Sequence, residues 1–226
     1  MDSSHLQSSI VKYLKTDCGF WLQWLLVTFG SFLVSLCFIE VDVRPYIRVY
    51  EGAIGGAVIG LAQGLILKQR FPTIALWWIP VSIVSWGLIG ASHFGAIGWM
   101  APRTLRLEPR VIFGLINGLQ VGALLGIGEW FVLRQHIKKA SLWILLSAGA
   151  WTIGLPIGWT IGGVLRQATR LFLCEVVGLA VAWLAIAAIT GIALIWLEKL
   201  YGLKQNLVQK STLWAKITYN LSKNYL

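Results

Sequence analysis

Two polar side chains stand at matching positions in two highly apolar stretches of this chain. Gln63 and Glu129 each follow a glycine by three residues and precede a base by five, Lys68 or Arg134. A carboxylate at the centre of a membrane-spanning helix costs about 2.5–3.5 kcal/mol on insertion scales, so such a group faces the interior of a bundle. One interpretation is an ion- or proton-handling site. The other is a hydrogen-bond clamp between Gln63 and Glu129, with Arg134 or His136 balancing the charge.

Other residues with possible chemistry are isolated. His93 lies inside an apolar stretch, where an imidazole could ligate a haem iron or a chlorophyll magnesium. Without a second ligand at matching depth, a packing role is the alternative. We expect Glu175 to pair with Arg170 or Arg166 near the end of its span. Since the sequence holds no P-loop, no metal-spaced Cys and His set and no nucleophile with a base, it predicts no enzyme, no metal site and no cofactor.

Long apolar helices must position these residues. Of the 226 residues, 57% are hydrophobic and 12% charged, whereas a soluble domain has about 25% charged residues. Windows of about 20 apolar residues predict six membrane spans. The chain should therefore be an all-α, polytopic transmembrane helix bundle at 19–198, between an amphipathic N-terminal segment, 1–18, and a basic amphipathic C-terminal segment, 199–226. The predicted spans are 19–39, 52–67, 73–99, 111–133, 141–165 and 171–197.

The distribution of basic residues predicts the orientation. Twelve of the 19 Lys and Arg residues fall in the two tails and the second and fourth loops, so the positive-inside rule makes both termini cytoplasmic. The net charge of +10 includes a run of lysines from Lys199 to Lys223. With its interleaved apolar residues this run predicts a helix that binds anionic lipid. Nucleic-acid binding would need a separate folded module, and the sequence has no room for one.

Glycines at four-residue spacing mark two of the spans. Small residues at this spacing let helix backbones approach closely in lipid. They motivate the leading hypothesis, a non-catalytic scaffold or assembly partner that packs against other helices, copies of itself or a larger complex. A permease for ions or small solutes that uses Gln63 and Glu129, and a pigment- or haem-binding protein that uses His93, are the alternatives. The two ladders are Gly52, Gly56, Gly60 and Gly64, and Gly114, Gly118, Gly122 and Gly126.

The ladders belong to an internal repeat with an offset of 66 residues. Its simplest form is three two-helix units, each a Trp-led helix followed by a ladder helix, with the third unit degenerate. Most of the 13 tryptophans are expected in belts at the membrane interfaces. The aligned segments are Gly56–Lys68 with Gly122–Arg134, Trp77 with Trp143 and, after a one-residue slip at Pro80, Trp86 with Trp151.

The pattern G-x-x-x-G-x-x-[Q/E]-x-x-x-L-[K/R], followed by a Trp-led helix, resembles a group of uncharacterised small multi-span proteins common in cyanobacteria and other photosynthetic or filamentous bacteria. The resemblance covers most of the chain and implies a bacterial inner or thylakoid membrane. It implies no activity. The residues that carry it are Gly56, Gly60, Gln63, Leu67 and Lys68, and Gly122, Gly126, Glu129, Leu133 and Arg134.

Overall fold

The protein is an all-helical bundle. The computed structural model describes the backbone of residues 3–43, 46–92 and 98–224, and the side chains of residues 16–43, 46–92 and 98–200. Those residues form six helices and no strand, and each helix contains a stretch long and apolar enough to cross a membrane. This confirms the predicted fold class. The helices are α1 (Ser3–Ser35), α2 (Val49–Leu67), α3 (Pro72–Ser92), α4 (Leu107–Leu133), α5 (Leu142–Thr169) and α6 (Leu173–Asn224).

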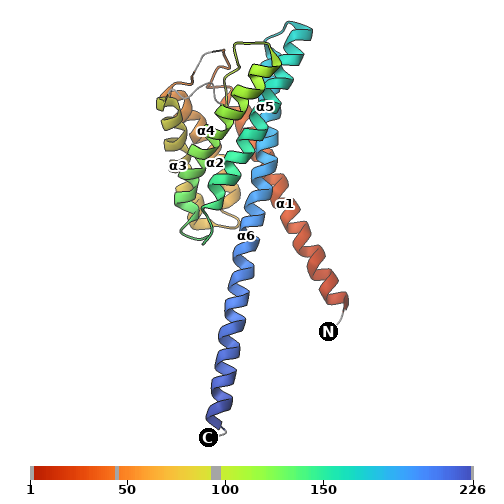
Figure 1. Ribbon diagram of the computed structural model, residues 1–226, viewed down its shortest axis with the longest axis vertical. Helices are drawn as coiled ribbons and strands as arrows, with labels where there is room; N and C mark the ends of the chain where they lie inside the picture. Colours follow the sequence, from red (N-terminus) through yellow and green to blue (C-terminus); the bar gives the residue numbers. More distant parts are fainter. Residues whose placement is uncertain (1–2, 44–45, 93–97, 225–226) are drawn as a thin grey trace.

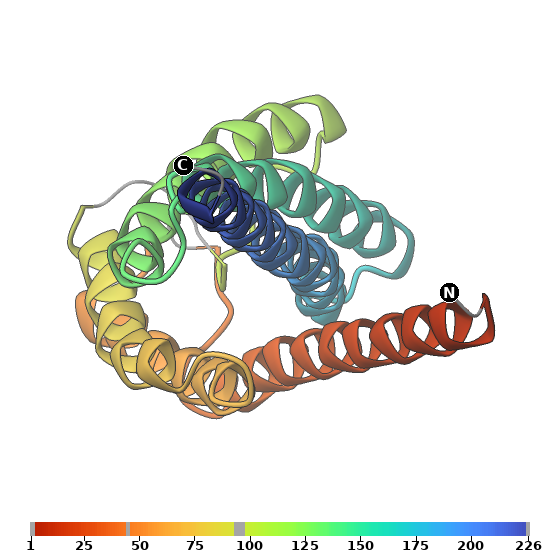
Figure 2. The same cartoon turned by 90° about the horizontal axis from the view of Figure 1, so that it is seen from below.

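The helices contact one another in a closed ring. Each helix packs against its neighbours in the chain, and α6 packs against α1. In Figure 2 the chain passes from α1 through α2 and α3 to α4 around one side of the bundle and returns through α5 and α6. The two ends of the chain therefore complete the bundle together.

The two ends of the bundle differ. At one end, here the terminal end, α1 and α6 extend beyond the other helices (Figure 1). The opposite end, here the loop end, carries the segments that join α1 to α2 and α3 to α4. The sequence boundaries at 18 and 199 both fall inside continuous helices. The third helix ends at Ser92 and not at 99 as expected, and residues 98–101 are buried outside any helix.

Eight tryptophans are buried among the side chains that the structure describes, which corrects the expectation that most of the 13 would lie in interfacial belts. Trp86, Trp99, Trp151 and Trp183 form an aromatic cluster inside the ring, with centroid separations of 4.8–5.9 Å between contacting rings. Such edge-to-face and offset contacts add about 0.5–1.5 kcal/mol per pair beyond burial. Aromatic side chains therefore fill the part of the ring nearest the loop end.

The loop segment Gly98–Ala101, here the plug, closes the ring at the loop end. Three buried indoles fix it through hydrogen bonds. Trp183 donates to the Gly98 carbonyl (2.9 Å), Trp159 donates to the Met100 carbonyl (3.1 Å), and Trp99 itself donates to Ser35 Oγ on α1 (2.7 Å). The Trp183 and Trp159 indoles therefore satisfy backbone carbonyls of a loop that lies within the bundle, and the Trp99 indole joins that loop to α1.

Both predicted glycine ladders pack against the helix that follows them. A Cβ at Gly56 would lie 2.5 Å from the Ser82 carbonyl oxygen, and a Cβ at Gly122 would lie 2.5 Å from the Ser147 carbonyl oxygen. Real side chains do not approach so closely, so α2 meets α3, and α4 meets α5, at positions that only glycine allows. Close packing inside the chain therefore accounts for the ladders.

Candidate functional site

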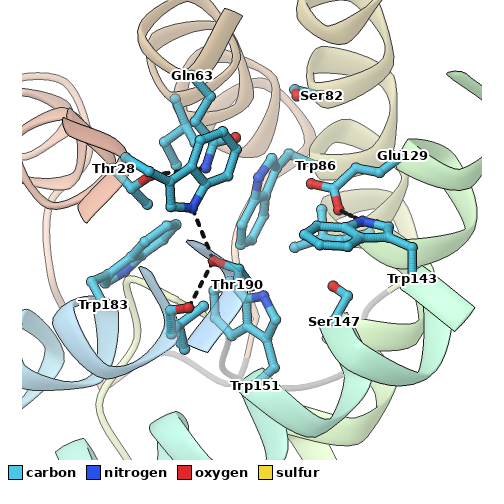
Figure 3. A pocket seen from close by; sticks show the side chains of 14 residues that line it. Thr28, Gln63, Ser82, Trp86, Glu129, Trp143, Ser147, Trp151, Trp183 and Thr190 are labelled. Carbon is cyan, nitrogen blue, oxygen red and sulfur yellow. Dashed lines mark hydrogen bonds between the residues drawn. The ribbon is translucent and has the colours of Figure 1, made fainter. Parts of the chain in front are cut away.

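A small polar cavity lies inside the ring, between the aromatic cluster and the terminal end. Its volume is about 30 Å³, enough for about one or two water molecules. All six helices line it, and its lining includes no Lys, Arg or His. Its polar lining residues are Thr28, Gln63, Ser82, Glu129, Ser147 and Thr190 (Figure 3).

Three indoles hold polar side chains of this site in place. Each indole comes from an odd-numbered helix and donates to a polar residue of an even-numbered helix. The bonds run from Trp78 Nε1 to Gln63 Oε1 (2.9 Å), from Trp143 Nε1 to Glu129 Oε2 (2.5 Å) and from Trp24 Nε1 to Thr190 Oγ1 (3.1 Å).

The odd-numbered helices share a spacing that sequence reasoning missed. Each carries a Trp, then a Ser or Thr four residues later, then an aromatic residue after four more. The first residue makes the indole bond, the second lines the cavity, and the third joins the apolar core of the ring. The three sets are Trp24, Thr28 and Phe32; Trp78, Ser82 and Trp86; and Trp143, Ser147 and Trp151.

This spacing corrects the predicted alignment of the tryptophans. Trp78, and not Trp77, is the counterpart of Trp143, because Trp78 is buried and bonded to Gln63 whereas Trp77 is 59% exposed. The one-residue slip therefore falls between Lys68 and Trp78, and Pro80 is not its cause.

Gln63 and Glu129 reach the same cavity, but the predicted clamp between them is wrong. In Figure 3 they lie on opposite sides of Trp86. Gln63 donates to Thr28 Oγ1 (3.1 Å) and accepts from its indole partner, while Glu129 accepts from Trp143. Glu129 therefore has a neutral donor as its partner among the described residues.

Neither base expected beside Glu129 balances its charge. The Arg134 guanidinium lies over the rings of Phe131 and Trp130, 4.8 and 5.0 Å from their centroids. No ion pair joins Glu129 to Arg134 or His136 among residues 16–43, 46–92 and 98–200. The two side chains are not paired because they point in different directions. Arg134 caps α4 at the terminal end, whereas Glu129 points to the centre of the ring.

The buried carboxylate of Glu175 has a partner that the sequence did not indicate. Glu175 receives two bonds from Arg110, at 2.5 and 2.9 Å, and one from Arg166 at 3.2 Å. Arg110 is completely buried and also donates to the carbonyls of Thr104 and Trp159. The expected pairing with Arg166 is confirmed. The alternative partner, Arg170, instead ends α5 in a left-handed conformation (φ 65°).

Two predicted sites lie outside the described residues: His93 and the side chains of the basic C-terminal segment beyond residue 200. Within the described residues, no group of three or more His, Cys, Asp and Glu could hold a metal ion. The central cavity, at about 30 Å³, is also about ten times smaller than the pockets that hold ordinary organic ligands.

Comparison with protein-family models, with curated proteins and with solved structures finds no match to this chain. The six apolar helices define a multi-pass membrane protein. Its particular role must therefore be inferred from the geometry of the cavity.

Proposed function

We propose that the protein is a membrane carrier for a single small positive charge, a proton or a bare monovalent cation, bound in the central cavity at Glu129. The observation that supports this most directly is a half-buried carboxylate facing a cavity whose lining contains no basic residue. An ionised carboxylate removed from water needs either a proton or a nearby cation to offset the cost of desolvation.

The size and lining of the cavity support this choice of substrate. A volume of about 30 Å³ holds a water molecule or a bare ion and excludes sugars, amino acids and pigments. Gln63, Ser82 and Ser147 add neutral oxygen atoms, the ligand type that hard cations prefer. The carboxylate supplies the charge and the neutral groups supply coordination or a relay of hydrogen bonds.

The closed ends of the ring support a carrier over an open channel. The aromatic cluster and the plug lie between the cavity and the loop end. A second apolar cluster, including Leu67, Trp78 and Leu133, lies towards the terminal end. Passage therefore requires these layers to open in turn around a site that stays fixed.

The predicted scaffold role loses the observation that motivated it, because both glycine ladders are used inside the chain. As proposals we keep the resemblance to small bacterial multi-span proteins and the bacterial membrane that it implies. With both termini cytoplasmic, the terminal end would face the cytoplasm.

Flux into sealed vesicles tests the proposal. The purified protein is placed in liposomes with a pH-sensitive dye or a sodium or potassium indicator inside, and a potential of either sign is applied. We expect Glu129→Gln, which keeps an acceptor for Trp143, to abolish the flux. The control Glu108→Gln removes an exposed carboxylate from the same helix and should leave it unchanged.

The dyes separate the two substrates: flux of protons without other cations identifies a proton carrier, and flux that follows Na⁺ or K⁺ identifies a cation carrier. Wild-type flux in Glu129→Gln would overturn the proposal. So would the absence of all three fluxes from a correctly folded wild-type protein.

A further inference from the structure

A second cavity lies on the outside of the bundle, between α3 and α4. These two helices are the most loosely packed neighbours in the ring. Their seam forms an open groove of about 410 Å³, a size typical of sites for organic ligands. Trp77, Val84 and Leu88 form one wall, and Ile127 and Phe131 form the other. All five are exposed apolar side chains on helices that can span a membrane, so the groove opens towards lipid chains.

The length of the groove matches one leaflet of a bilayer. From Trp77 to Leu88 a helix rises about 16 Å, and half of a hydrocarbon core is about 15 Å. The groove therefore offers a continuous apolar track for one acyl chain along α3, from Trp77, five residues inside the terminal end of that helix, to Leu88, four residues before its loop end.

A positive charge stands where that chain would carry its headgroup. Arg134 is exposed at the terminal end of α4, and its guanidinium lies 4.8 Å from the centroid of Phe131, a groove residue. Arg134 has no carboxylate partner among the described residues. A guanidinium is well suited to bind a phosphate through two hydrogen bonds.

We infer that the groove between α3 and α4 binds one anionic phospholipid, with an acyl chain along the groove and its phosphate at Arg134. This site is distinct from the central cavity and does not rest on the proposed carrier function. The floor of the groove nevertheless adjoins the cavity wall. Gly128 and Ser85 touch at the floor of the groove. Glu129, which follows Gly128, and Ser82, one helical turn before Ser85, line the cavity. The bound lipid would therefore cover the outer side of the ring wall next to the cavity.

Native mass spectrometry of the full-length protein tests this inference, with phosphatidylglycerol and phosphatidylcholine of identical chains as probes. The wild type should keep one phosphatidylglycerol under conditions that remove phosphatidylcholine. Arg134→Gln should reduce that preference about fivefold, the effect of one base near an anionic surface. Ile127→Trp, which fills the groove, should remove the retained lipid of either kind.

Matched variants control for general effects. Lys139→Gln removes an exposed base of the same connecting segment, and Leu115→Trp adds bulk at an exposed apolar position of α4 outside the groove. Both should behave like the wild type. Val84→Phe fills the groove from α3, so it supplies the same test if Ile127→Trp fails to fold. Unchanged lipid retention in folded groove-filling variants, or an unchanged headgroup preference in Arg134→Gln, would overturn the inference.

Discussion

Arg110 joins parts of the chain that are far apart in sequence. Its guanidinium binds Glu175 of α6, the carbonyl of Trp159 in α5 and the carbonyl of Thr104 in the loop that follows the plug. Its side chain is inaccessible to solvent, and that of Glu175 is 1% exposed. A buried charge without its partner is strongly unfavourable, so the two residues depend on each other.

We expect Glu175→Gln to lower the free energy of unfolding by about 3–5 kcal/mol, because it leaves the buried Arg110 charge without its carboxylate. Denaturant unfolding in detergent measures the effect, and Glu108→Gln is the exposed control on α4. The double variant Arg110→Met, Glu175→Leu should be less destabilised than Glu175→Gln. Equal losses in the two variants of the buried pair would show that the charge is not the cause.

The sequence predicted polar residues at the centre of the bundle more reliably than it predicted their partners. Gln63 and Glu129 were identified because each follows a glycine by three residues and precedes a base by five. Both residues line the cavity. Their indole partners, Trp78 and Trp143, could not be separated from the other tryptophans, because an interfacial and a buried Trp have the same local sequence signal. Arg110 is 65 residues away from Glu175, and no spacing rule links the two.

At the scale of helices, four-residue glycine spacing marks the helix face at which two backbones come into contact. It identifies a face of a helix but not the neighbour that this face meets. The sequence therefore left open whether the ladders bind another chain or the same one. A third set, Gly154, Gly158 and Gly162, brings α5 against α6, and sequence reasoning missed it although the spacing is the same.

Replacing Gly122 with Ala should destabilise the bundle by about 1–3 kcal/mol, the usual cost of overpacking. The added methyl would lie 2.5 Å from the Ser147 carbonyl oxygen and 2.6 Å from Ala148 Cα. Gly149→Ala, at a helix position with no neighbouring atom within 4 Å, should be neutral or stabilising by up to about 1 kcal/mol. Thermal unfolding of the two variants in the same detergent compares them. Similar melting temperatures would contradict the packing role.

For the whole molecule, hydropathy alone predicted six spans, but it could not show how they close into a ring. The sequence predicts units made of a Trp-led helix followed by a ladder helix. In the structure, the ladders of α2 and α4 instead pack on the Trp-led helix that comes next. A repeating pattern does not reveal where one unit begins. Sequence similarity therefore fits units that start with the Trp-led helix as well as units that start with the ladder helix. As a result α6 pairs with α1, through Trp21 to Ala188 and Trp24 to Thr190.

Arg70 should contribute to this closure at the terminal end. It binds Asp17 of α1 at 3.1 Å and Glu198 of α6 at 2.5 Å, and it lies over the ring of Phe20. Partly exposed pairs are each worth up to about 1 kcal/mol. Arg70→Gln should therefore speed hydrogen exchange about fivefold in the 16–24 part of α1 and leave α4 and α5 unchanged.

Lys68→Gln, an exposed charge in the same turn, should have no effect on exchange. Faster exchange throughout the bundle in Arg70→Gln would indicate general destabilisation, and no change in α1 would show that the ring closes without Arg70.

The pairing of the first helix with the last has a consequence for biosynthesis. Helices leave the ribosome in chain order, so α2 with α3, and α4 with α5, can associate as soon as the second member emerges. The indole of Trp24 can form its hydrogen bond only after Thr190, 166 residues further along the chain, has been synthesised. Until α6 is inserted, the wall between α1 and α5 is missing and the carboxylate of Glu129 stands in an open groove. The central cavity is therefore completed by the last helix to be made, and a chain interrupted before α6 has no enclosed cavity.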